Sequence, residues 1–118
     1  MRMTEKRVEE AFAAFLGADG WDVSTNNRDY VDLLAKRGSE VIVAELKGHT
    51  SSPGLDVDTG YGQLLRRMDP EQTSVRYALV VPVTLRKHVT RVCQGVRERL
   101  GVELYVVDDD GAISLVSD

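Results

Sequence analysis

The feature that most constrains this chain is a pair of apolar segments separated by only two residues. Residues 30–37 and 40–47 are both rich in Val, Ile, Leu and Tyr, and only Gly38 and Ser39 lie between them. Glycine followed by serine suits the two central positions of a type II′ turn, which joins antiparallel strands. The sequence therefore predicts a tight β-hairpin in which Arg37 faces Glu40.

This hairpin predicts that two carboxylates meet on one face of the sheet. Counting back from the turn places Asp32 opposite Glu45, and Lys47 lies on the same face one pair further along. Opposed Cβ atoms are about 4.5–5.5 Å apart, and like charges there are destabilising unless something offsets them. A bound cation would offset them. The alternative is that these are ordinary solvent-facing charges on an amphipathic hairpin.

The neighbours of the two carboxylates favour the cation. Apolar residues occupy both faces of the predicted hairpin: Leu34, Val41 and Val43 beside the carboxylates, and Val31, Leu33, Ala35, Ile42, Ala44 and Leu46 on the opposite face. Apolar residues on both faces are typical of central strands that are covered on both sides. A carboxylate pair at the end of such a hairpin is costly to desolvate unless it is paired or binds metal.

Length and composition predict one domain, residues 1–118. A chain of 118 residues with 42% hydrophobic residues has enough apolar material for one core. No apolar stretch is long enough to span a membrane and the N-terminus lacks a signal-peptide core, so we expect a cytoplasmic protein without a membrane partner. The single Cys93 falls in a helical apolar pattern and is predicted to be buried. One cysteine and two histidines do not predict a zinc site.

The charge of the chain is unevenly distributed. The net charge is −4, yet residues 60–100 carry eight Lys/Arg against three acidic residues. Phosphate contacts dominate nucleic-acid affinity, so this basic segment is a candidate nucleic-acid interface. The alternative is a set of solvated charges on surface helices, and both interpretations stay open. The candidate contacts are Arg66, Arg67, Arg86, Lys87 and Arg91.

The remaining pattern predicts an α/β fold with a mixed sheet flanked by helices. Thr4 is a suitable N-cap for the first helix, and Gly101 is a suitable stop for the last. A loop that contains Gly, Ser and Pro, residues 48–59, is long enough to move over a substrate. The predicted helices are about 5–16, 60–68 and 84–100, and the predicted strands besides the hairpin are 21–24, 75–82, 104–107 and 112–116.

Together these elements resemble the core of the PD-(D/E)XK nuclease superfamily. The resemblance covers about residues 5–82 and implies the restriction-endonuclease-like fold, an αβββαβ core, with the later helix and strands as additions. Val31 stands where the family name has proline, at a variable position. The matching features are a helix with Glu9, a strand with Asp32, a strand ending in Glu45-Leu46-Lys47 and a helix with Gln63 before a buried strand.

The resemblance implies a catalytic metal site. Asp32, Glu45 and the backbone carbonyl of Leu46 would bind Mg²⁺ or Mn²⁺, and this small number of ligands would leave positions open for phosphate and water. Lys47 would orient the attacking water or stabilise negative charge in the transition state. A lysine that only neutralises Glu45 is the alternative, and both roles can hold together.

Two further residues carry implied roles. Glu9 would hold a second metal ion or a metal-bound water, with simple helix solvation as the alternative. Gln63 would bond the nucleic-acid backbone or the metal waters, with a partly exposed helix position as the alternative. Arg67 follows Gln63 by four residues, where the RecB-like branch has tyrosine, so junction-resolving and restriction-like branches stay open.

The expected function is therefore a metal-dependent endonuclease that hydrolyses DNA phosphodiester bonds in repair, junction resolution or restriction. Cleavage of two strands with one site per chain favours a homodimer. Two alternatives remain. One is a non-catalytic module with the same fold that binds nucleic acid or protein, and the other is an RNA-cleaving defence enzyme.

Overall fold

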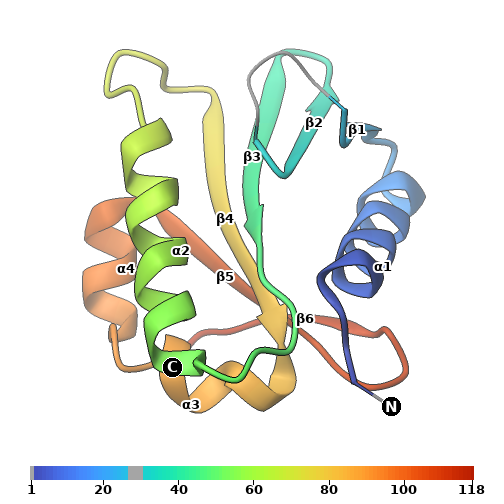
Figure 1. Ribbon diagram of the computed structural model, residues 1–118. Helices are drawn as coiled ribbons and strands as arrows, with labels where there is room; N and C mark the ends of the chain where they lie inside the picture. Colours follow the sequence, from blue (N-terminus) through green and yellow to red (C-terminus); the bar gives the residue numbers. More distant parts are fainter. Residues whose placement is uncertain (1, 27–30) are drawn as a thin grey trace.

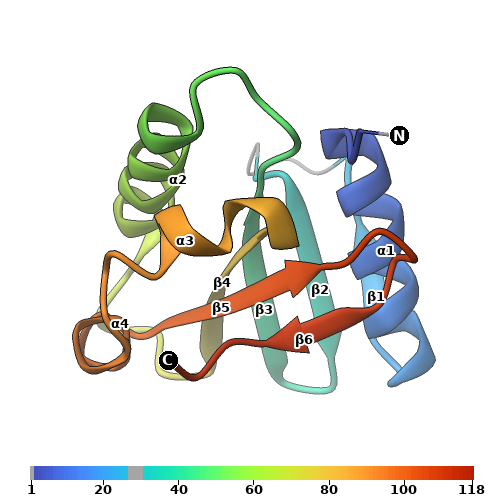
Figure 2. The same ribbon diagram turned by 90° about the horizontal axis from the view of Figure 1, so that it is seen from below.

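The computed structural model describes residues 2–26 and 31–118, which form a six-stranded sheet with helices on both faces (Figure 1). Helix α1 covers one face, and α2, α3 and α4 lie on the other (Figures 1 and 2). In chain order the elements are α1 (Glu5–Ala18), β1 (Asp22–Ser24), β2 (Leu33–Arg37), β3 (Glu40–Leu46), α2 (Pro53–Arg67), β4 (Val75–Pro82), the 3₁₀ turn η1 (Val83–Leu85), α3 (Arg86–Val89), α4 (Gln94–Leu100), β5 (Val102–Val107) and β6 (Ile113–Leu115).

The sheet is mixed, as predicted. The strands lie side by side in the order β1 to β6; β3, β4 and β5 are parallel to one another, and the remaining neighbours are antiparallel. The hairpin has the predicted register, with Arg37 paired to Glu40 and Leu33 to Ala44. Gly38 has a φ of 60°, which a glycine adopts without strain at the first turn position. Residue 30, the predicted start of the first arm, lies outside the described residues.

The core under α1 explains why the first helix forms where it does. The side chain of Thr4 accepts a hydrogen bond from the backbone N–H of Arg7 at 3.2 Å, which caps the helix as predicted. One stripe of α1 then packs on the sheet through Val8, Phe12 and Leu16, which are all buried. The sheet contributes the hairpin face that carries Leu33, Ala35, Ile42, Ala44 and Leu46.

The second core lies under α2. Val57, Tyr61 and Leu64 of this helix pack on apolar side chains of β4 and β5. The Tyr61 hydroxyl donates a hydrogen bond to the backbone carbonyl of Val89 at 2.6 Å, which ties α2 to α3. The helix therefore stands over the parallel half of the sheet, while the hairpin face beside it is only partly covered.

The predicted start of α2 is wrong. The helix begins at Pro53, seven residues before the predicted Gly60, and the connection after β3 is correspondingly short. Proline is favoured in the first turn of a helix, where its missing N–H costs nothing. The glycines of this segment lower its helix propensity, but the burial of Val57 and Tyr61 stabilises the helix. Residues 47–52 therefore connect β3 to α2, in place of the predicted loop over 48–59.

The predicted helix over 84–100 is also wrong, because it is broken into η1, α3 and α4. Cys93 has an extended backbone with φ −68° and ψ 161°, and its side chain is exposed rather than buried. Arg97 is 2% exposed and donates to the backbone carbonyls of Val92 at 2.6 Å and Asp118 at 2.5 Å. Sequence periodicity did not reveal that a charged residue would occupy the inner face.

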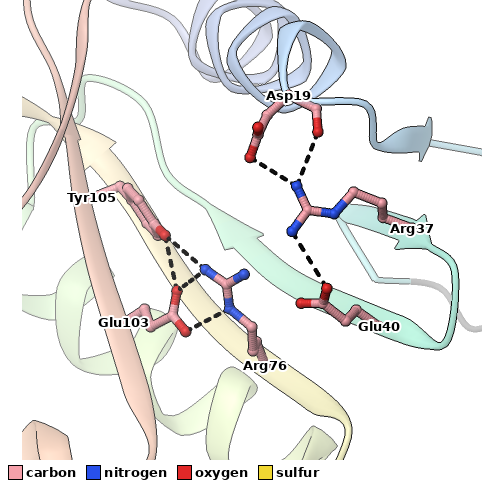
Figure 3. Close-up of polar contacts among 6 residues, drawn as sticks. All are labelled: Asp19, Arg37, Glu40, Arg76, Glu103 and Tyr105. Carbon is pink, nitrogen blue, oxygen red and sulfur yellow. Dashed lines mark hydrogen bonds and ion pairs between the residues drawn. The ribbon is translucent and has the colours of Figure 1, made fainter.

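Two groups of charged residues, which Figure 3 shows, each contain an arginine that lies near the Trp21 ring. In the first, Arg37 donates to the carboxylate of Asp19 at 2.9 Å and lies 3.4 Å from that of Glu40. The Arg37 guanidinium also lies 4.4 Å from the centre of the Trp21 ring. These contacts connect the end of α1 to the hairpin turn.

The second group joins β4 to β5. Arg76 donates two hydrogen bonds of 2.8 Å to the carboxylate of Glu103, and the Tyr105 hydroxyl donates a third to the same carboxylate at 2.8 Å (Figure 3). Burial alone would raise the pKa of Glu103, but the bonds from Arg76 and Tyr105 and the Arg76 charge lower it below its ordinary value. Burial and the bond to Glu103 raise the pKa of Tyr105 to about 12.

Among the described residues, no helix is long and apolar enough to cross a membrane.

Candidate active site

Asp32 and Glu45 meet at the end of the hairpin away from the turn. Asp32 immediately precedes β2, and Glu45 lies near the end of β3. One carboxylate oxygen of Asp32 accepts the backbone N–H of Leu46 at 2.9 Å, which fixes its position against β3. The carboxyl groups of Asp32 and Glu45 are themselves hydrogen-bonded to each other. The predicted convergence of these two side chains is therefore present.

The electrostatics of the pair follow from burial. Glu45 is only 3% exposed, and burial is the main reason why its pKa is raised. The hydrogen bond and the negative charge of Asp32 raise the pKa further, whereas the charges of Arg67 and Lys47 oppose the shift, and the resulting pKa is about 7. Because the pKa of Glu45 is about 7, a large fraction of the molecules near neutral pH carry a protonated Glu45 carboxyl, which can share its proton with Asp32 through this hydrogen bond.

Helix α2 passes closely over Lys47 because a glycine faces it. A β-carbon at Gly60 would lie 3.3 Å from Cε of Lys47 and 3.1 Å from Cδ1 of Leu79. The backbone N–H of Lys47 donates to the carbonyl of Val80 at 3.0 Å, which continues the pairing of β3 with β4. The lysine is thus held beside the pair by the sheet below and the helix above.

The start of α1 contributes a carboxylate that the sequence did not single out. The backbone N–H of His49 donates to the carbonyl of Met3 at 2.7 Å, so the chain after β3 runs against the start of α1. Partial burial raises the pKa of Glu5, the charge of Asp32 raises it further, and the charge of Lys47 lowers it. Glu5 is therefore coupled electrostatically to the site. The alternation of β3 gives no signal for this contact, which depends on how α1 docks.

Glu9, the α1 carboxylate that the sequence predicted for the site, has a local partner. Glu9 accepts a hydrogen bond from the Lys6 ammonium at 3.2 Å, one turn away on the same helix. Its charge also contributes to the raised pKa of Glu5. The charges of Asp32 and Lys47 both act on the pKa of Glu5, which therefore belongs to the site.

Gln63 lies on the stripe of α2 that faces the site. Gly60, Gln63 and Arg67 are spaced three and four residues apart, so they share one side of the helix. Gly60 approaches Lys47, and Nε of Arg67 lies 3.9 Å from Oε1 of Glu45. The side-chain oxygen of Gln63 is buried and has no hydrogen-bond donor among the described residues. A buried acceptor without a donor favours a partner supplied from outside the described chain.

The candidate nucleic-acid contacts form two groups rather than one patch. Arg66 and Arg67 lie in the last turn of α2. Arg91 lies near the first turn, where its Nη1 is 3.9 Å from the β-carbon position of Gly54. Lys87 is exposed, and Arg86 is paired with the carboxylate of Asp118 at 2.7 Å. The 15 residues of α2 separate the groups by about 20 Å.

A groove of about 510 Å³ lies beside the site, between the hairpin and the last turn of α2. Its apolar floor is formed by half-buried side chains of three strands, Leu34, Val41, Val43 and Val75. Lys36, Arg66 and Arg67 also line it. Because Arg67 contacts Glu45, the groove opens next to the carboxylate pair.

The donor atoms suit a hard divalent cation but are few. Within residues 2–26 and 31–118, no three His, Cys, Asp or Glu side chains gather into a metal-binding cluster. A divalent cation can replace the proton between two carboxyl groups. Its positive charge then offsets the negative charges of both carboxylates. The residues present therefore fit Mg²⁺ or Mn²⁺ only with most coordination positions left to water or substrate.

Comparison with known proteins does not assign a family. No protein-family model matches the chain, and no curated protein or solved structure is significantly similar to it.

Proposed function

We propose that this protein is a metal-dependent nuclease with a restriction-endonuclease-like core that hydrolyses phosphodiester bonds of DNA. The observation that carries the proposal is the pair Asp32 and Glu45, in which the buried Glu45 lies against the half-buried Asp32 at one end of the hairpin and beside Lys47. A purely structural role does not explain this pair, because removing two neighbouring carboxyl groups from water costs free energy. Perturbed titration of this kind is typical of functional sites.

Each residue has a distinct role in the proposal. Asp32, held by the N–H of Leu46, and Glu45 would hold the cation, together with the Leu46 carbonyl. A bound Mg²⁺ would supply positive charge for the phosphate and the attacking water. Lys47 would orient that water or stabilise the charge that develops on the phosphate. Glu5 would bind a water or a second cation from α1, the role first assigned to Glu9.

A non-catalytic binding module is the second candidate function. The shared proton favours it, because it lets the two carboxyl groups stay together without any metal. The net charge of −4 points in the same direction. In this case the groove and the basic residues would bind nucleic acid or protein, and the carboxyl pair would only stabilise the hairpin end.

The deciding experiment incubates the purified protein with supercoiled plasmid, branched DNA and RNA in Mg²⁺ or Mn²⁺, with EDTA as the metal-free reference. Cleavage that requires metal and is abolished in Asp32→Asn and Lys47→Ala supports the nuclease. The matched control is Asp109→Asn at an exposed turn, which should cleave like the wild type. Identical behaviour of the wild type and both site variants on every substrate would favour the binding module.

Cleavage of both strands of a duplex would need two copies of this site, so the proposal includes a homodimer on DNA. Sedimentation of the protein with and without a cleavable duplex tests this part separately. A single copy bound to a duplex that is cut on both strands would contradict it.

A further inference from the structure

The groove beside the carboxylate pair has an uncommon combination of surfaces. Its floor is apolar, with Leu34, Val41, Val43 and Val75 only half-buried on the hairpin and β4. Helix α2 covers the parallel strands and leaves this part of the sheet open. Tyr77 closes the floor on the β4 side, where its hydroxyl accepts the backbone N–H of Asp69 at 3.1 Å.

The rim of the groove is basic on two sides. Lys36 stands on the hairpin side, and Arg66 and Arg67 stand on the helix side. Among the described lining residues, Asp69 carries the one negative charge, and its carboxylate accepts the backbone N–H of Glu71 at 3.0 Å. The groove thus offers cations on both sides of an apolar floor, which is complementary to a phosphate backbone that carries flat apolar rings.

A DNA duplex could contact the basic rim of the groove but not its apolar floor. The phosphates of a duplex are exposed and can contact Lys and Arg, whereas its bases are stacked inside the helix and cannot cover the floor. An unpaired nucleotide can do both, because its base is free to lie on apolar or aromatic side chains while its phosphates meet Lys or Arg. A volume of about 510 Å³ lies in the range of sites that take a small planar ligand.

We infer that this groove binds a single-stranded segment of nucleic acid next to the scissile phosphate, so that the protein acts on strands with unpaired nucleotides. The inference rests on the proposed nuclease function and adds its substrate class. Arg67 is the connection between the two sites, since it lines the groove and its Nε lies 3.9 Å from Glu45. A base in the groove would leave the adjoining phosphate near the carboxylate pair.

The test measures binding in EDTA, where neither metal nor cleavage is needed. Fluorescence anisotropy compares a labelled single strand of about 12 nucleotides with the duplex of the same sequence, over a series of salt concentrations. The wild type should bind the single strand at least tenfold more tightly than the duplex. Arg66→Glu should weaken single-strand binding about tenfold and lower the slope of log K against log salt by about 0.7.

Two matched controls separate the groove from general charge and stability effects. Arg99→Glu makes the same charge change on the exposed side of α4 and should leave single-strand affinity within twofold of the wild type. Leu34→Asn should weaken single-strand binding at least fivefold while duplex binding stays unchanged. Leu115→Asn, at a leucine 61% exposed on β6, should change neither.

Equal or tighter duplex binding, or equal losses in Arg66→Glu and Arg99→Glu, would overturn the groove assignment even if the protein cleaves DNA. Selective single-strand binding by a protein that never cleaves would refute the nuclease proposal and leave the groove intact. The two proposals therefore fail in different experiments.

Discussion

Gly48 and the backbone of Glu5 are in such close contact that a side chain at position 48 has no room. A β-carbon at Gly48 would overlap the backbone nitrogen of Glu5 and lie 2.6 Å from the carbonyl carbon of Thr4. The chain leaving β3 therefore passes directly against the first turn of α1. This contact brings Glu5 towards Asp32 and Lys47, and it is the point where the helix and the site are joined.

The first prediction concerns Gly48→Ala. The new methyl group must push α1 away from β3, so we expect a loss of about 2–3 kcal/mol in the free energy of unfolding. Urea denaturation monitored by circular dichroism measures it. Gly17→Ala is the matched control, because nothing lies within 4 Å of its β-carbon position. That helical change should be neutral or stabilise by up to about 1 kcal/mol. Equal effects of the two changes would contradict the close contact.

The second prediction concerns the pH dependence of stability without metal. The pKa of Glu45 is raised from 4.5 to about 7, mainly by burial and then by Asp32. Between these values the folded protein binds more protons at Glu45 than the unfolded chain does, so this group's contribution to stability falls as pH rises. Glu45→Gln should remove this loss and be more stable than the wild type at pH 8 by about 1–3 kcal/mol.

Urea denaturation in EDTA at pH 5 and pH 8 provides the measurement. The difference between Glu45→Gln and the wild type should shrink towards pH 5, where the native carboxyl is already protonated. Glu71→Gln, in the exposed loop before β4, should have the same free energy of unfolding as the wild type at both pH values. A wild type that becomes more stable relative to Glu45→Gln as pH rises would contradict the shared proton.

The third prediction separates Glu5 from Glu9, which both lie on α1. Mg²⁺ binds the folded protein in the proposal, so it should raise the melting temperature. Glu5→Gln should reduce this rise because Glu5 interacts with Asp32 and Lys47, whereas Glu9→Gln should change it little because Glu9 pairs with Lys6. Thermal melts over a Mg²⁺ titration measure both. A larger loss in Glu9→Gln would restore the assignment made from sequence.

The fourth prediction concerns Glu103, which lies on β5 in the group that joins β4 to β5. Hydrogen bonds from Arg76 and Tyr105 stabilise its charged form, and the pKa of Glu103 is lowered despite burial. Glu103→Gln should cost about 1–2 kcal/mol at pH 7, a value reduced because both Arg76 and Glu103 are partly exposed. A depressed pKa contributes stability above the unfolded value of 4.5, and that stability is lost as pH falls below it.

Denaturation at pH 7 and pH 3 measures this effect, which should be smaller at pH 3. Asp118→Asn, which breaks the solvent-exposed pair with Arg86, is the reference and should cost less stability at pH 7 than Glu103→Gln does, because water screens this pair. Equal costs for Glu103→Gln and Asp118→Asn would contradict a stabilising role for the first group.

The hairpin and its carboxylates could be predicted because they depend on short-range rules. A two-residue turn fixes the pairing of Arg37 with Glu40, and strand alternation then determines every other partner without reference to the rest of the chain. The caps at Thr4 and Gly101 followed in the same way from local backbone preferences. These parts of the fold and the central pair of the site are properties of neighbouring residues.

Packing between distant segments decided the rest. Burial of Val57 and Tyr61 extended α2 over residues that were predicted to form a loop, and hydrogen bonds to the carbonyls of Val92 and the distant Asp118 placed the charged Arg97 in the interior. The coupling of Glu5 to the site and the groove beside it arise only when α1 and α2 dock on the sheet. The sequence by itself determined which residues pair across the hairpin, because turn geometry acts within a few residues. The tertiary structure alone decided what surrounds that pair, because side-chain volume and burial act between elements far apart in the chain.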